Sequence, residues 1–439
     1  MRKFKVAAGA ILASAIGVGV VTTTAGAAPS GTDRVDAVGS AAQQATAPGS
    51  GQLVVDWTNE LLQIQKTPGA QPATVHPTRS LAILDAAIED AVVSTTHEGQ
   101  PYLFTVVSPR SARADAAAAQ AAHDTLAVLY PSAKSQVDQL LASELAAIPG
   151  DPGKSGGTQV GHTVAQILLG LRAGDGSGVT PPPFVPGIQP GNYRPTPPAF
   201  AAAQFTNWGS VEPFVLNTPD QFRPAAPPSL TSAAYATALN EVQSLGQDVS
   251  ATRTADETQA AKFWNPPIWT TWNEITANLV TEQQTSLEKA AQVFADLNLT
   301  FADTAIAFYD AKYTYQLWRP VTAIRLAASD GNPATVANPT WTPLVGTAAD
   351  PSYPGAHSAI SEAGAIVLSA FFEPDTHLTV SSDALPGVTR SFDGFQAAAD
   401  EAGLSRIFAG VHTRVDHVAG QELGQDVARF VLARGNAGD

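Results

Sequence analysis

Apolar residues in this 439-residue chain recur at helical spacing, and this feature constrains the fold more than any other. In segment 78–94, Leu81, Leu84, Ile88 and Val92 fall near one face of a helix. Comparable patterns cover segments 112–130 and 135–148 and resume after residue 232, and alanine, a strong helix former, is abundant. No segment alternates apolar and polar residues over a length that would build a sheet. The sequence therefore predicts an all-α fold made of helical bundles.

The first 27 residues have the pattern of a secretory signal peptide. A basic start is followed by an apolar run over residues 6–21 and by the small residues Ala25 and Ala27 of a cleavage site. The run is short for a membrane anchor, and no other stretch approaches the length of a spanning helix. We therefore expect residues 1–27 to be removed and the rest to be exported without a membrane span. The chain contains no cysteine, so a large core has to stabilise it without disulfides.

Composition divides the exported chain into four parts. Residues 28–52 are rich in small and polar residues and are expected to form a disordered tail. Helical patterns predict an N-terminal helical region over 53–178 and a C-terminal one over 231–439, with the core motifs in 300–435. The segment between them, 179–230, is dense in proline. An ordered strap is favoured over a flexible linker because aromatic residues interrupt the prolines, namely Phe184, Tyr193, Phe200, Trp208 and Phe214.

Charge excludes two classes of partner. With 24 basic and 39 acidic residues, the formal net charge is -15. Such a chain has no broad electrostatic attraction for nucleic acid or for an anionic membrane surface. A site for an anion would have to be a local basic cluster in an acidic background.

The first candidate cluster lies in a predicted helix. Thr300 and Asp303 have the spacing of a capping box, so we expect the helix to begin near Phe301. Lys312 and Arg319 are two turns apart and would project from one helix face before a proline ends the helix. A solvated basic face is the plain alternative. A partner anion is favoured because the surrounding residues are mostly aromatic or apolar, namely Tyr313, Tyr315, Leu317 and Trp318.

The second candidate precedes another helix. Pro354 and Gly355 form a turn, and a helix is expected to begin just after His357 and to run to about Phe372. Free backbone N–H groups at such a start favour an anion. A histidine in this position is, taken alone, more often structural.

The third candidate is the stretch 405–417, "SRIFAGVHTRVDH". If the stretch is helical, His412 and Asp416 are neighbours four residues apart, and Asp416 accepts from Nδ1 of His412. The Nε2 atom is then free as a nucleophile or ligand. Arg406 adds a guanidinium group for an oxyanion, whereas His417 points about 100° away round the helix and is expected to pack. A zinc site lacks the His-Glu-x-x-His spacing and a clear third ligand.

Together these stretches resemble a known superfamily. The chain is similar to the vanadium-dependent haloperoxidases and the related type 2 phosphatidic acid phosphatases in three motifs: Lys312-x6-Arg319-Pro320, Pro354-Gly355-Ala356-His357 and Ser405-Arg406-x5-His412-x3-Asp416. The core resemblance covers residues 287–435. Segments 75–92, 156–178 and 190–200 also resemble the bacterial secreted haloperoxidase-like branch.

The resemblance implies a pocket for vanadate or tetrahedral phosphate. Its implied oxyanion-binding groups are the side chains of Lys312, Arg319 and Arg406 and the backbone N–H groups of Gly355 and Ala356. It further implies that His412 bonds to vanadium or attacks phosphorus, that His357 is the acid/base, and that Asp416 orients His412. The chain departs from the family's Pro-Ser-Gly-His motif at Gly355 and Ala356, and so lacks one serine hydroxyl.

Three functions fit this pattern. The first is a secreted vanadium haloperoxidase that uses hydrogen peroxide to oxidise halide, with an organic acceptor. The second is a secreted acid phosphatase that cleaves phosphate esters through a phosphohistidine. The third is a non-enzymatic phosphate-binding or structural protein, which the complete set of basic residues and histidines argues against. The upstream resemblance favours the first. The sequence leaves open the halide, the organic substrate and the oligomeric state.

Overall fold

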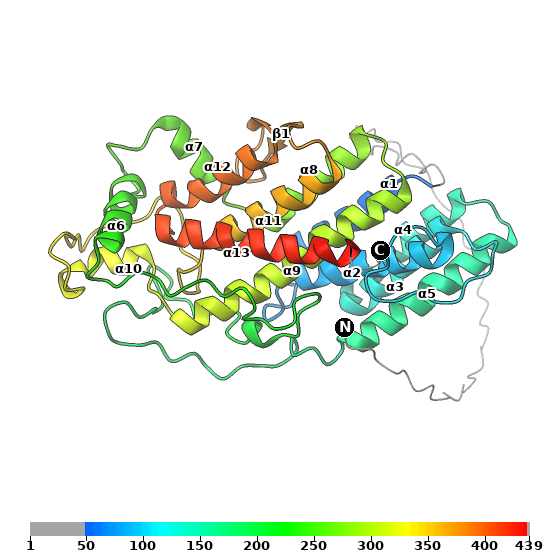
Figure 1. The fold of residues 1–439 in the computed structure, drawn as a ribbon, viewed down its shortest axis with the longest axis horizontal. Helices are drawn as coiled ribbons and strands as arrows, with labels where there is room; N and C mark the ends of the chain where they lie inside the picture. The colour runs from blue at the N-terminus through cyan, green and yellow to red at the C-terminus, as the bar shows by residue number, and fades with distance from the viewer. Residues whose placement is uncertain (1–48, 437–439) are drawn as a thin grey trace, which may run out of the picture. The chain divides into compact units, whose positions relative to one another are not determined.

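The chain is almost entirely helical in the computed structural model, which describes residues 49–436 (Figure 1). The predicted all-α fold is confirmed. The predicted signal peptide and most of the predicted tail lie outside the described residues. The helices are α1 (Gln52–Lys66), α2 (Pro77–Thr96), α3 (Ala114–Leu129), α4 (Lys134–Ala147), α5 (Pro152–Arg172), α6 (Ala233–Leu245), α7 (Ala255–Phe263), α8 (Ile268–Glu282), α9 (Leu287–Tyr315), α10 (Pro320–Arg325), α11 (Ala356–Phe371), α12 (Phe395–Phe408) and α13 (Arg414–Leu432). Four short 3₁₀ helices are η1 (Pro131–Ala133), η2 (Trp208–Ser210), η3 (Ala327–Ser329) and η4 (Ala433–Asn436).

One small sheet was not expected from the sequence. Strands β1 (His377–Ser381) and β2 (Thr389–Asp393) form an antiparallel hairpin in which Thr379 pairs with Ser391. In β1 the side chains of Leu378 and Val380 are buried and their neighbours exposed. Five residues of alternation are too short a signal to separate from the background of a helical chain.

Helix α9 forms the centre of the core. It packs against α2, α11 and α13 (Figure 1), and nearly all of its residues from Leu287 to Ala311 are buried. A helix surrounded in this way is buried on every face, so its polar side chains must find partners within the protein. The contact between α2 and α9 joins the two predicted helical regions. No helix in residues 49–436 is both long and apolar enough to cross a membrane.

The predicted start of this helix was wrong. Helix α9 begins at Leu287, where the Ser286 side chain accepts from the backbone N–H of Lys289. Asp303 lies in the interior of the helix, and its carboxylate accepts three backbone N–H groups of the proline-rich strap, from Phe214, Val215 and Leu216, at 2.6–2.8 Å. The capping-box pattern misled because its acidic residue serves a distant segment instead of a helix end.

The proline-rich segment 179–230 lies on the helices with only η2 as a regular element. Tyr193 and Trp208 are fully buried, whereas Phe200 is 64 % exposed. Backbone pairing also holds the segment, since the Tyr193 N–H donates to the Gln316 carbonyl at 2.6 Å. Aromatic burial and backbone contacts therefore fix the path of a segment that has little secondary structure of its own.

We expect Asp303→Ala to lower the free energy of unfolding by about 2 kcal/mol or more, because it leaves three N–H groups of the strap without their acceptor. Asp303→Asn keeps one acceptor oxygen and should cost less. Urea denaturation of both variants measures the difference. If the alanine variant were as stable as the wild type, the strap would not depend on this carboxylate.

The start of the fold also differs from the prediction. The disordered tail was expected to reach residue 52, but α1 begins at Gln52. The backbone N–H of Gly51 donates to the Thr285 carbonyl at 2.9 Å, and Ser50 forms an isolated bridge with Ser286. The last residues of the predicted tail therefore belong to the packed structure.

Candidate active site

The two basic residues of the first motif do not share a helix. Helix α9 ends at Tyr315, and Gln316 takes the left-handed conformation with φ 49°. Arg319 follows as the N-cap residue of α10. The prediction that Lys312 and Arg319 project from one helix face was therefore wrong. They come together because both contact one loop.

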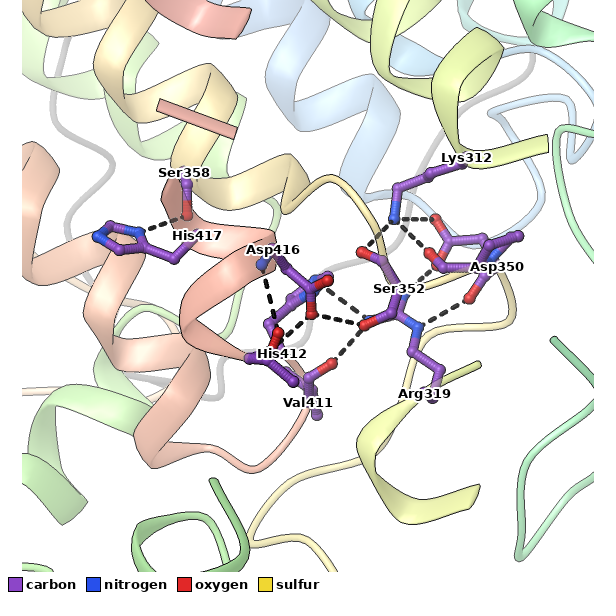
Figure 2. A network of polar contacts seen from close by, with 11 residues as sticks. Lys312, Arg319, Asp350, Ser352, Ser358, Val411, His412, Asp416 and His417 are labelled. Atoms are coloured by element: carbon purple, nitrogen blue, oxygen red, sulfur yellow. Dashed lines mark hydrogen bonds and ion pairs between the residues drawn. The ribbon is translucent and has the colours of Figure 1, made fainter. Parts of the chain in front are cut away.

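That loop is the segment 350–352, directly before the second motif. Lys312 Nζ donates to the carbonyl oxygens of Pro351 and Ser352 and lies 3.6 Å from Asp350 Oδ2. Arg319 donates from Nε to the Asp350 carbonyl at 2.7 Å and from Nη2 to its carboxylate (Figure 2). Both cations are buried. Sequence reasoning missed Asp350 and Ser352 because a single residue in a loop has no periodic signal.

His412 lies outside the helix in which it was expected. It stands in the turn between α12 and α13, where Thr413 caps α13 and forms a capping box with Asp416. His412 Nδ1 is nevertheless 3.4 Å from Asp416 Oδ2. The same oxygen accepts from the Thr413 N–H and from the Ser352 hydroxyl, each at 2.7 Å. Figure 2 shows Ser352 between Lys312 and Asp416, so this residue links the two halves of the site.

The contacts of His412 define its tautomer. Arg319 Nη1 lies 3.1 Å from Nε2, and an arginine can only donate, so Nε2 must present its lone pair. The proton is then on Nδ1, facing Asp416. Burial and the Arg319 charge lower the pKa of His412 to about 3. The ring is therefore neutral near neutral pH, with Nε2 able to act as a nucleophile or a ligand.

A backbone carbonyl joins the remaining predicted residues. The carbonyl of Trp264, at the end of α7, lies 3.0 Å from His357 Nε2 and 3.4 Å from Arg406 Nη1. Arg406 Nη2 lies 3.3 Å from the Asn265 side-chain oxygen. The backbone N–H of His412 donates to the Arg406 carbonyl at 3.3 Å. Trp264 and Asn265 were not identified from the sequence.

His357 is also neutral. Desolvation of its ring, together with the charge of Arg406, lowers the pKa of His357 well below the usual value. Because a carbonyl only accepts, Nε2 carries the proton toward Trp264 and Nδ1 carries the lone pair. The Nδ1 atom is therefore the position at which this residue can take up a proton.

Arg406 has no charged partner among the described residues, since its two acceptors are a carbonyl and an amide oxygen. Burial and the Arg319 charge lower its pKa to about 10, which leaves it charged near neutral pH. Three cations thus meet only two carboxylates, those of Asp350 and Asp416. An unbalanced buried charge is costly unless an anion binds. The donor set therefore fits an oxyanion next to His412.

Comparison with known proteins places this arrangement in a family. The model of the VCPO second helical-bundle domain matches residues 292–437, which contain all three motifs. Over residues 292–437 the chain is therefore similar to the VCPO second helical-bundle domain. A search of curated proteins finds no match.

The VCPO-type fold extends over most of the chain. A solved structure described as the first bacterial vanadium-dependent iodoperoxidase superposes with a TM-score of 0.76 at 23% identity, covering 89% of this chain and 98% of that one. The holo form of a bacterial vanadium-dependent chloroperoxidase superposes with a TM-score of 0.66 at 15% identity, covering 84% and 95%. Its apo form gives 0.63 at 15% identity, covering 82% and 95%.

Within the VCPO-type domain, Gly355 differs from its expected role. Its N–H donates to the Asp416 carbonyl at 2.8 Å and is not available to an anion. A Cβ atom at Gly355 would lie 3.0 Å from that oxygen, so a serine here would require a shift. Ala356 opens α11, and its N–H has no acceptor within the helix. Of the two backbone N–H groups expected to bind an anion, only that of Ala356 does not donate to the Asp416 carbonyl.

The last histidine of the VCPO-type domain has a packing contact. His417 Nδ1 lies 2.9 Å from the Ser358 hydroxyl and connects α13 to α11. It does not join His412 and Asp416, consistent with its predicted orientation. Within residues 49–436, no group of three acidic or histidine side chains has the geometry of a metal site.

Proposed function

We propose that this protein is a secreted vanadium-dependent haloperoxidase that oxidises halide with hydrogen peroxide, with vanadate held at Nε2 of His412. One observation carries the proposal: the site holds three buried cations and a neutral histidine whose Nε2 faces one of them, and one positive charge is unbalanced. The solved structures with the same fold are haloperoxidases by description, which supports this chemistry over others with the same donors.

The residues of the site would have separate tasks. Bound vanadate would supply the Lewis-acidic centre at which peroxide is activated. Lys312, Arg319 and Arg406 would neutralise its oxygens and stabilise added charge. Asp416 keeps the proton of His412 on Nδ1, so that Nε2 remains a ligand. Desolvation keeps His357 neutral, ready to take a proton at Nδ1.

The direct test is to add vanadate, remove the excess by gel filtration, and measure both bound vanadium and peroxide-dependent bromination of a dye. We expect about one vanadium per chain and bromination only when vanadate, peroxide and bromide are all present. Protein carried through without vanadate is the control. Loss of all vanadium on filtration would contradict the proposal. Recovery of a shortened chain from the culture medium would test export.

An acid phosphatase acting through a phosphohistidine is the second candidate. The observation in its favour is at Gly355, where the serine hydroxyl of the family is missing and the N–H is engaged. Fewer donors would release an anion more readily, as a phosphatase requires in each cycle. Brisk hydrolysis of p-nitrophenyl phosphate by unloaded protein, with no bromination by loaded protein, would favour this activity.

A further inference from the structure

A carboxylate lies among the cations of the candidate site. Asp350 lies against both Lys312 and Arg319, and its side chain is only 9% exposed. Burial opposes its ionisation, but the charges of Lys312 and Arg319 hold its pKa below the usual value. Asp350 is thus an internal anion paired with two of the three cations that an oxyanion would use.

No other charged group near Asp350 adds to the pairing of its carboxylate with Lys312 and Arg319. Three tyrosines and a histidine also lie close enough to Asp350 to interact with it electrostatically. Burial raises the pKa of the tyrosines and lowers that of the histidine to about 3, so all four are neutral near neutral pH: Tyr193, Tyr309, Tyr313 and His76. His412 is neutral as well. Lys312 and Arg319 alone compensate the Asp350 charge.

An entering oxyanion would share these cations with Asp350. Two unprotonated anions within a few ångströms of each other repel strongly in a buried site. A proton on the entering oxyanion allows a hydrogen bond between the two anions, which offsets part of the repulsion, as in paired carboxylates that share one proton. An ionised carboxylate can only accept hydrogen bonds, so a protonated oxyanion can donate one to Asp350 and a fully deprotonated oxyanion cannot.

We propose that Asp350 is a specificity-determining residue that makes the pocket select oxyanions carrying a proton, such as hydrogen phosphate and hydrogen vanadate, over fully deprotonated ones such as sulfate. The inference rests on the proposed oxyanion site. It adds a selection that the three cations alone would not provide, since they attract any tetrahedral anion of similar size and charge.

The wild-type protein tests this directly by calorimetric titration with inorganic phosphate and with sulfate at mildly alkaline pH. Under these conditions both anions carry two negative charges, but only phosphate carries a proton. We expect phosphate to bind about ten-fold more tightly or better. Arsenate and selenate form a second pair with the same difference. Equal affinities within each pair would overturn the inference while leaving the oxyanion site intact, and no binding of any of the four would overturn both.

Two variants test whether Asp350 causes the preference for phosphate over sulfate. Asp350→Asn can both donate and accept, so sulfate should bind about ten-fold more tightly and the preference for phosphate should fall. Asp350→Glu keeps the charge and should keep the preference. If Asp350→Asn bound phosphate and sulfate more weakly by the same factor, while circular dichroism showed an intact fold, Asp350 would have only a structural role. That result would overturn the inference. If this variant does not fold, the wild-type anion pairs still decide.

Discussion

Replacing His412 with alanine is expected to abolish retention of vanadate and to lower any hydrolysis of phosphate esters by a factor of about 10³ or more. Both activities need the Nε2 lone pair that Arg319 contacts at 3.1 Å. Bound vanadium after gel filtration and the rate of p-nitrophenyl phosphate hydrolysis measure the two effects.

A matched control is available five residues further along. His417 is also buried, but it contacts Ser358 instead of the cationic pocket. His417→Ala should therefore retain vanadate even if it lowers stability. Should His412→Ala still bind vanadium as the wild type does, Nε2 would not be the ligand. The role of His412 would then have to be reassigned.

Replacing His357 with alanine should have a different effect. We expect bound vanadium to be largely unchanged and turnover to fall by about 10²–10⁴, because an acid/base acts in the transition state. The two histidines have different contacts: His357 lies against the Trp264 carbonyl, whereas His412 lies between Arg319 and Asp416. Vanadium content and bromination rate, measured on the same preparation, separate the two roles.

The pH profile offers a second measure of His357. A base works when deprotonated, and the pKa of His357 is lowered well below the usual histidine value. The acid limb of the wild-type rate profile should therefore lie below the range of an ordinary histidine, with no loss of rate between pH 7 and about pH 6.5. If His357→Ala lost vanadium as completely as His412→Ala, the acid/base assignment would be wrong.

Local signals predicted several elements closely. The segment 78–94 lies within α2, and the helix expected just after His357 begins at Ala356 and ends at Phe371. Hydrophobic period, proline and glycine mark these elements, and all act over a few residues. The same local rules failed at Asp303, whose carboxylate binds backbone N–H groups 87–89 residues away. They failed again at His412, where a four-residue spacing suggested a helix but the chain turns.

The sequence by itself determined the helical class and the identity and order of the basic and histidine residues in the three motifs. Tertiary structure alone decided how they meet. Asp350 reaches Arg319 across 31 residues, Ser352 reaches Asp416 across 64, and Arg406 reaches the Trp264 carbonyl across 142. Loop residues and backbone groups supply these contacts, so they leave no periodic pattern in the sequence. The charge balance of the pocket, including its internal carboxylate, exists only once the distant loops have packed together.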